Sequence, residues 1–255
     1  MTDVFFEILT PEPLDRREDG AALFKLWFDI APGFFPDRAG AYEPLRHKIT
    51  PDTVDACLDD WQLGYFTKRV SQPKSTSSIL MQYGPHRRHG TWKINIKDHR
   101  KFDQPAFYNL MRECISRFRV HFGFIHIPTL IDIERGRLDG TVVFLDPGKK
   151  KINLFVPIIK IIKDFVPNLY FMTVFGDHYI NLFTREKLLA TPAYKALSLP
   201  TGEISIQLTA NVLDCVTDEV KFEKKRRTAR EFLNSNVFFD TENNLEHSYN
   251  IPAFE

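Results

Sequence analysis

The stretch from Ser78 to Ile96 reads SILMQYGPHRRHGTWKINI, and its pattern is typical of two strands joined by a turn. Both ends are rich in β-branched and aromatic residues, and the turn-forming pair Gly84-Pro85 lies between them. In the second run the large apolar residues alternate, as Trp92, Ile94 and Ile96. Because successive strand residues point to opposite faces, this alternation places the three side chains on one buried face. The stretch therefore predicts a β-hairpin.

A helix and a third strand follow the hairpin. Gln104-Pro105 begins the helix, since proline is favoured in the first helical turn, and apolar residues recur at helical spacing as far as Phe118. Phe122–Ile127 indicates a strand. This β-β-α-β run predicts an α+β fold, a mixed and largely antiparallel sheet with helices packed on it. Further elements are expected as a helix at 154–165, a strand at 169–175, a helix at 179–189, a strand at 203–208 and a helix at 218–233.

The first third of the chain predicts helices and turns. Apolar residues recur at helical spacing between Asp19 and Ile30, and Pro32-Gly33 ends that helix. A second helix begins at Thr50-Pro51, an N-cap followed by proline. We therefore expect a helical N-terminal segment over residues 1–65 and an α+β domain over residues 66–255, the two forming one compact unit.

The near-neutral charge of the chain hides a partition along the sequence. The 255 residues carry 34 Lys and Arg against 33 Asp and Glu, a net charge of +1. The balance is −7 over residues 1–65, +10 over 66–151 and −2 over 152–255. A dedicated nucleic-acid binder is usually strongly basic overall, so the net charge argues against that class.

The sequence favours a cytoplasmic protein that does not bind membranes. The N-terminal residues lack the basic and apolar regions of a secretory signal. The most apolar stretch, 152–175, contains charged residues and two prolines, whereas a membrane span needs about 20 apolar residues with few charges. The 3 cysteines are odd in number and far apart, so they predict neither a disulfide framework nor a metal knuckle.

Linear signatures of catalysis are absent from the sequence, including phosphate loops, dinucleotide fingerprints and zinc-protease motifs. His86 and His89 have a spacing that could ligate zinc, but two arginines lie between them, so we favour a solvated basic hairpin. Asp132 and Glu134 are flanked by arginines, so we favour a charged surface loop. The alternative is a metal-dependent or nucleic-acid-processing enzyme built on these four residues. We expect His126 to be a core or edge histidine.

A second basic run, Lys224-Lys225-Arg226-Arg227 with Arg230, falls within the helix expected at 218–233. Adjacent charges wrap around a helix, so we favour a solvated helix surface. The alternative for this run is a nucleic-acid patch. A basic-surface module that binds nucleic acid would use the basic middle third of the chain, residues 66–151.

The acidic first third combines carboxylates with aromatic residues. Such a surface suits a basic protein partner, because opposite charge steers the encounter and aromatic side chains anchor it. The alternative, that the aromatic residues are core and the acids ordinary surface charge, is equally compatible with the pattern. The candidate partner-binding residues are Asp29, Asp37, Tyr42, Glu43, Asp55, Asp59, Asp60 and Trp61.

Short motifs of the middle and C-terminal parts of the chain carry a resemblance to a known family. They are Tyr83-Gly84-Pro85, Arg87-Arg88-His89, Gly123-Phe124-Ile125-His126, Val174-Phe175-Gly176-Asp177-His178-Tyr179, Leu182-Phe183-Thr184-Arg185-Glu186-Lys187-Leu188-Leu189, Thr191-Pro192-Ala193-Tyr194, Ile206-Gln207-Leu208-Thr209, Phe238-Phe239-Asp240 and Tyr249-Asn250-Ile251-Pro252-Ala253-Phe254. Together they resemble the immunity protein 52 family, TsiT-like immunity proteins of type VI secretion, over roughly residues 40–255.

This resemblance implies an antitoxin of the cytoplasm. It would bind and neutralise a cognate secreted toxin, a nuclease of the restriction-endonuclease-like type. It would be no enzyme, would need no cofactor or metal and would bind no nucleic acid itself. The family supplies no catalytic residues to transfer to this chain.

Overall fold

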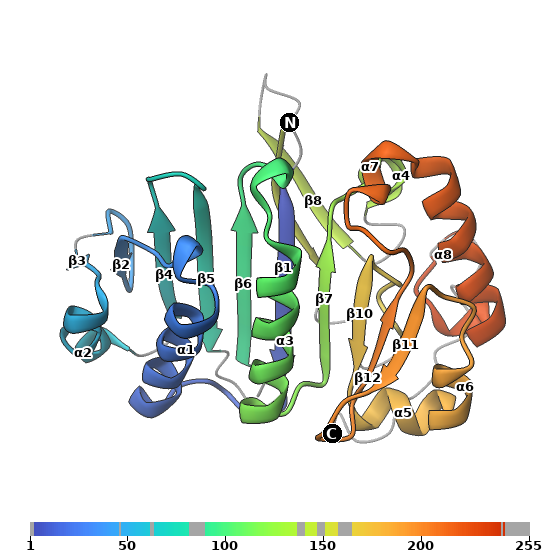
Figure 1. Ribbon diagram of the computed structural model, residues 1–255, viewed down its shortest axis with the longest axis horizontal. Helices are drawn as coiled ribbons and strands as arrows, with labels where there is room; N and C mark the ends of the chain where they lie inside the picture. The colour runs from blue at the N-terminus through green and yellow to red at the C-terminus, as the bar shows by residue number, and fades with distance from the viewer. Residues whose placement is uncertain are drawn as a thin grey trace. The chain divides into compact units, whose positions relative to one another are not determined.

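The structure is a computed structural model that describes residues 3–45, 47–61, 64–81, 90–136, 141–146, 151–157, 165–240 and 242 (Figure 1). The chain divides into two units, each with its own internal contacts. Residues Val4–Gly123 form the N-terminal unit, and residues Phe124–Glu255 together with Met1–Asp3 form the C-terminal unit. His86 and His89 lie outside the described residues.

An antiparallel sheet forms the frame of the N-terminal unit. Its strands are ordered β1 (Val4–Thr10), β6 (Gly90–Ile96), β5 (Ser75–Met81), β4 (Gly64–Arg69), β2 (Arg38–Gly40) and β3 (His47–Lys48). The expected hairpin is present as β5 and β6, with Ile79 paired to Trp92. Trp92, Ile94 and Ile96 are all buried, as the alternation predicted.

Two helices, α1 (Arg17–Ile30) and α3 (Gln104–Phe118), cover one face of this sheet (Figure 1). Their aromatic side chains pack edge to face on those of the strands. The ring centroids of Trp27 and Trp92 are 5.3 Å apart, and those of Phe6 and Phe107 are 5.8 Å apart. Many of the 23 phenylalanines of the chain, including Phe6, Phe24 and Phe107, are buried in this way. Short helical turns complete the unit: η1 (Pro32–Phe34), η2 (Pro51–Thr53), α2 (Val54–Cys57), η3 (Leu58–Asp60) and η4 (His99–Lys101).

The first 65 residues differ from the helical segment that we expected. They contribute strands β1, β2 and β3 to the sheet as well as helix α1. The boundary expected at residue 65 falls inside β4, so these residues belong to a unit that continues to Gly123. Strand β1 was missed because all seven of its residues are buried, which removes the alternation that marks a half-exposed strand.

The C-terminal unit is also α+β. Strands β11 (Lys195–Ser198), β12 (Ile204–Gln207) and β10 (Met172–Phe175) pair antiparallel, and β7 (Phe122–His126) follows β10 in the strand order. Strands β8 (Thr141–Asp146) and β9 (Lys151–Pro157) form a separate hairpin. The helices are α4 (Leu130–Arg135), α5 (Asp177–Phe183), α6 (Arg185–Leu189), α7 (Asp214–Thr217), α8 (Glu219–Leu233) and η7 (Ser235–Val237).

The predictions of two helices in this unit were wrong in part. The helix at 154–165 overlaps strand β9, and residues 158–164 lie outside the described part of the chain. A short apolar run fits a strand as well as a helix, and here the antiparallel partner β8 selects the strand. The helix at 179–189 is divided into α5 and α6 at Thr184, whose φ of 68° interrupts the helix. None of the described helices is long and apolar enough to cross a membrane.

Candidate functional site

Helix α8 of the C-terminal unit presents three faces, because successive residues turn by about 100° around a helix axis. The buried face consists of Phe222, Arg226, Ala229 and Leu233. A second face, Val220, Glu223, Lys224, Arg227, Arg230 and Glu231, lines a hollow in the surface. The third, outer face consists of Lys221, Lys225, Thr228 and Phe232.

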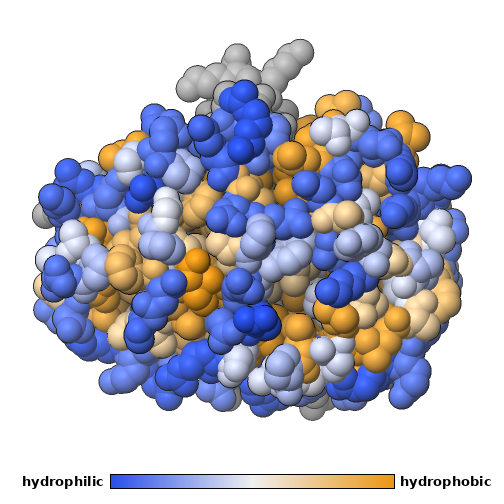
Figure 2. Space-filling view, in the orientation of Figure 1, coloured by the Kyte–Doolittle hydropathy of each residue, from blue (hydrophilic) through white to orange (hydrophobic). Residues whose placement is uncertain are grey.

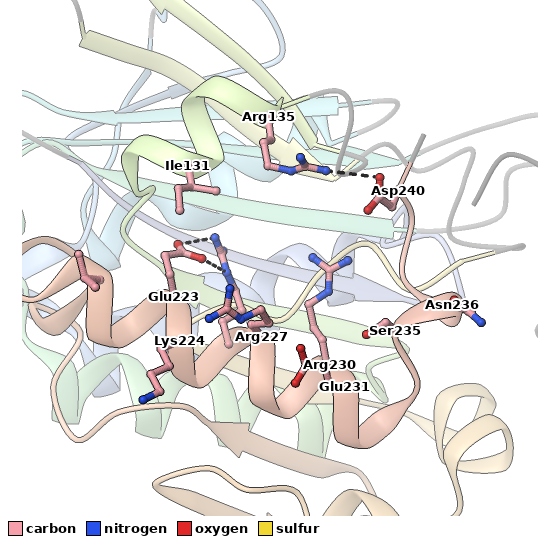
Figure 3. A pocket seen from close by; sticks show the side chains of 12 residues that line it. Ile131, Arg135, Glu223, Lys224, Arg227, Arg230, Glu231, Ser235, Asn236 and Asp240 are labelled. Atoms are coloured by element: carbon pink, nitrogen blue, oxygen red, sulfur yellow. Dashed lines mark hydrogen bonds and ion pairs between the residues drawn. The ribbon is translucent and has the colours of Figure 1, made fainter. Parts of the chain in front are cut away.

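The hollow has a volume of about 750 Å³. Ile131 and Arg135 of α4 contribute to its lining from one side, α8 contributes from another, and Ser235, Asn236 and Asp240 close its C-terminal end (Figure 3). We call this feature the α8 hollow. Its size is within the range of binding sites in proteins, and it is the candidate site of this unit.

Positive charge predominates in the α8 hollow. Five cationic side chains line it against three carboxylates, those of Glu223, Glu231 and Asp240. Arg135 pairs with Asp240 at 3.4 Å and with Glu242 at 2.9 Å. The Arg230 guanidinium lies over the Phe238 ring, 5.0 Å from its centroid. The cations that line the hollow are Arg135, Lys224, Arg226, Arg227 and Arg230.

Two of these cations, Lys224 and Arg227, are exposed, and their side chains form no hydrogen bond or ion pair with the described residues. Every other cation of the lining has a partner. Their charge is therefore available to a ligand or a partner protein. Figure 3 shows both side chains extending from α8.

A buried ionic cluster underlies the hollow and fixes α8 to α4. Arg226 is 3% exposed; its Nη1 donates to Asp132 Oδ1 at 2.7 Å and its Nε donates to Glu223 Oε2 at 2.9 Å. Thr129 caps α4: its backbone N–H donates to Asp132 Oδ2 at 2.7 Å, and its hydroxyl lies 2.8 Å from Glu223 Oε1. The cluster holds the guanidinium of Arg226 in one orientation.

Charge compensation keeps this cluster ionised. Burial by itself raises the pKa of the Asp132 carboxyl. The neighbouring Arg226 and His126 lower this pKa by more than burial raises it, so it lies well below its ordinary value. Burial lowers the pKa of Arg226, but Asp132 and Glu223 more than reverse the effect. A buried carboxylate and guanidinium that are fully hydrogen-bonded to each other remain charged.

His126 extends the cluster toward a cysteine in a sequence of contacts that resembles a nucleophilic triad. Its Nε2–H donates to Asp132 Oδ2 at 2.7 Å, and its Nδ1, which accepts from the backbone N–H of Phe171, lies 3.8 Å from Cys215 Sγ. His126 and Cys215 are both fully buried. Burial raises the pKa of the Cys215 thiol well above its ordinary value, so the thiol stays protonated. A buried, protonated thiol is not activated as a nucleophile.

These contacts correct two expectations from the sequence and bear out a third. Asp132 lies on helix α4 and is buried, so the charged surface loop was wrong for this residue. The prediction that the basic run is a solvated helix surface was wrong for Arg226, which is buried. His126 is the core histidine that we expected. The signal that could have placed Arg226 is its position in the apolar stripe of α8, between Phe222 and Leu233.

Exposed apolar side chains adjoin the α8 hollow. Val220 is 84% exposed, Leu130 is 64% exposed, and Ile131 lies beside them. One carboxylate oxygen of Glu219 accepts from the backbone N–H groups of both Leu130 and Ile131, which joins the N-terminal ends of α4 and α8. We call Leu130, Ile131 and Val220 the apolar lip. Figure 2 shows apolar surface at the upper right, over the region where Figure 1 labels α4 and α7.

The partner-binding residues expected in the acidic third lie in the N-terminal unit, and several already have partners within it. Trp61 is buried, and its indole N–H donates to the carbonyl of Leu14 at 2.8 Å, so it is not available to anchor a partner protein. Asp55 and Asp59 both pair with Arg17, and a carboxylate oxygen of each lies 3.3 Å from the Arg17 guanidinium.

The remaining acidic candidates are spread over this unit. Asp60 lies 3.0 Å from the ring of His47, and Asp29 pairs with Lys25 at 2.7 Å. Asp37 accepts from the backbone N–H groups of Val70 and Ser71. Tyr42 is 76% exposed and is followed by the exposed Glu43, so these two keep the accessibility that a docking role needs.

Among the described residues, no group of three or more His, Cys, Asp or Glu side chains is arranged to hold a metal ion. Glu134, the second carboxylate singled out with Asp132, is exposed on α4. The two carboxylates therefore do not converge on one site.

Comparison with known proteins identifies a shared fold. No protein-family model matches the chain, and no curated protein matches it significantly. Among solved structures the chain is similar to "Pseudomonas aeruginosa T6SS protein PA0821", with a TM-score of 0.53 and 11% sequence identity. The match covers 90% of this chain and 73% of that chain. At this identity the likeness shows the fold alone.

Proposed function

We propose that this protein is an immunity protein that binds and neutralises a toxin of a type VI secretion system. The observation that carries the proposal is the fold likeness to a T6SS protein, which extends over 90% of the chain. The motifs quoted above, which resemble the immunity protein 52 family, point to the same system independently. On that resemblance the toxin is a nuclease of the restriction-endonuclease-like type, met in the cytoplasm.

The proposed action is binding rather than catalysis. The Cys215–His126–Asp132 set, which has the connectivity of a nucleophilic site, is buried and holds a protonated thiol. The described residues of the C-terminal unit include an accessible cationic hollow bordered by an apolar lip, a combination that suits a docking surface. An antitoxin of this kind needs no cofactor. Nanomolar neutralisation corresponds to about −12 kcal/mol.

Co-expression tests the proposal. Cells that carry the toxin gene adjacent to the gene of this protein are expected to die when the toxin is induced alone and to grow when both proteins are made. The two proteins are expected to co-purify as a stable complex. Cell death despite accumulation of both folded proteins, with no complex recovered, would refute the immunity function.

A further inference from the structure

We propose that the α8 hollow and its apolar lip form the toxin-docking surface, and that they receive a segment of the toxin that carries carboxylates next to an apolar side chain. This inference rests on the proposed function and names the surface that performs it. It assigns docking to the C-terminal unit instead of to the candidate residues of the acidic first third.

Charge complementarity specifies the carboxylates. Lys224 and Arg227 are exposed cations of the hollow with no partner among the described residues. An arginine fork matches a carboxylate through two parallel N–H donors, and such charge-assisted bonds are the stronger class of hydrogen bond. The carboxylates of a toxin segment would supply the compensation that the fold itself does not supply to these two residues.

The surroundings of these two cations are held in place before a partner binds. Arg226, in the same lining, is held by Asp132 and Glu223. Arg135 of α4 is held by Asp240 and Glu242, and Figure 3 shows its contact with Asp240. A surface whose side chains are ordered in advance loses less conformational entropy on association. The hollow is therefore suited to tight binding.

The apolar lip and the mixed charges favour a protein segment over other ligands. Val220 and Leu130 expose aliphatic side chains beside the cations, and such a pairing of apolar and arginine contacts is typical of protein interfaces. Glu231 and Asp240 lie in the same lining, so anionic side chains are interspersed among the cations, whereas a nucleic-acid site is a continuous basic patch or stripe. A small-molecule site would be lined mainly by apolar side chains, whereas charged side chains predominate here.

A pair of charge-reversed variants on one helix tests the inference. Lys224→Glu with Arg227→Glu reverses the two free cations of the hollow. Lys221→Glu with Lys225→Glu makes the same change in net charge on the outer face of the same helix. Binding of the toxin encoded beside the gene is measured by calorimetry with wild type and both variants. All four positions lie outside the buried face of α8, so both variants are expected to fold.

We expect the hollow variant to raise the Kd for the toxin about 100-fold or more, and the outer-face variant to change it by less than about 5-fold. Equal Kd values for the two variants would overturn the docking surface while leaving the immunity function intact. No binding by the wild type would instead refute the immunity function, and this inference with it. A wild-type protein that binds a DNA duplex at physiological salt through Lys224 and Arg227 would also overturn it.

Two milder variants separate the role of the hollow from general electrostatics. Arg227→Lys keeps the charge but removes the planar fork, so we expect about a 10-fold loss of affinity that persists at high salt. Val220→Ser removes an apolar contact of the lip without changing charge, and it is expected to accelerate dissociation several-fold. If neither variant changes the affinity or the dissociation rate, the toxin does not occupy this surface.

Discussion

Asp132 and Arg226, 94 residues apart in the sequence, form a buried ion pair that joins α4 to α8. The two helices that carry the proposed docking surface are thus held together by two buried charges, each of which needs the other as its partner. Removing one partner of a buried ion pair leaves the other charge without compensation, at a cost of about 3–5 kcal/mol. This residue-scale contact determines whether the hollow keeps its shape.

Asp132→Asn is expected to lower the free energy of unfolding by about 3–5 kcal/mol, because Arg226 then keeps only Glu223 as a charged partner. Urea denaturation measures the change. Glu134→Gln, an exposed position on the same helix, is the matched control and should change stability by less than about 0.5 kcal/mol. Similar losses in both variants would contradict the role assigned to the ion pair.

Glu7 predicts that the stability of the N-terminal unit depends on pH. Burial raises the pKa of its carboxyl from 4.5 to about 7, with Lys93 3.5 Å away opposing the rise. The folded state therefore holds this proton more tightly than the unfolded chain, so stability falls as the pH rises from about 4.5 to about 7. Glu7→Gln should flatten this part of the stability profile, measured by thermal denaturation. An unchanged slope would show that another group is responsible.

At the scale of elements, helix α1 packs closely against the short helix η3 through a glycine. A Cβ added to Gly20 would lie 2.7 Å from side-chain atoms of both Leu58 and Trp61. Trp61 cannot move freely, because it is buried and its indole is hydrogen-bonded to Leu14. The glycine is thus explained by close packing rather than by flexibility.

Gly20→Ala is therefore expected to destabilise the protein by about 1–3 kcal/mol, although alanine normally stabilises the interior of a helix by about 1 kcal/mol. Thermal unfolding measures the effect. Gly33→Ala is the control, since nothing lies within 4 Å of its added Cβ. Stabilisation at Gly20 would show that α1 and η3 are less closely packed than described.

At the scale of the whole molecule, the cysteines report on both units. Cys57 and Cys114 lie in the N-terminal unit and Cys215 lies in the C-terminal unit, and all three are buried free thiols. Burial raises the pKa of each thiol above its ordinary value. Reaction with a thiol reagent therefore requires local or global unfolding of the unit that holds the cysteine.

The native protein is expected to release almost no chromophore from Ellman's reagent over minutes, whereas the denatured chain should react at all 3 cysteines. Following the reaction in increasing urea would show whether the two units open together or separately. Rapid release of one equivalent of chromophore by the native protein would contradict the burial of one thiol, and mass spectrometry would identify the cysteine that reacted.

Local pattern was sufficient for much of the fold. The alternation of Trp92, Ile94 and Ile96 placed a strand, and the apolar stripes of α3 and α8 placed two helices, because period and capping are properties of neighbouring residues. Pattern failed at β1 and β9. In β1 every residue is buried, so the strand carries no alternation, and in β9 an apolar run took its conformation from its partner β8.

The sequence by itself determined the α+β class, the main helices and the scarcity of catalytic signatures, since these depend on composition and on residues close together in the chain. Tertiary structure alone decided which charges are functional candidates. Arg226 is buried because Asp132 meets it from another helix, whereas the neighbouring Lys224 and Arg227 remain exposed on the hollow. Trp61, expected at a docking surface, became core for the same reason: burial depends on residues that are distant in sequence and adjacent in space.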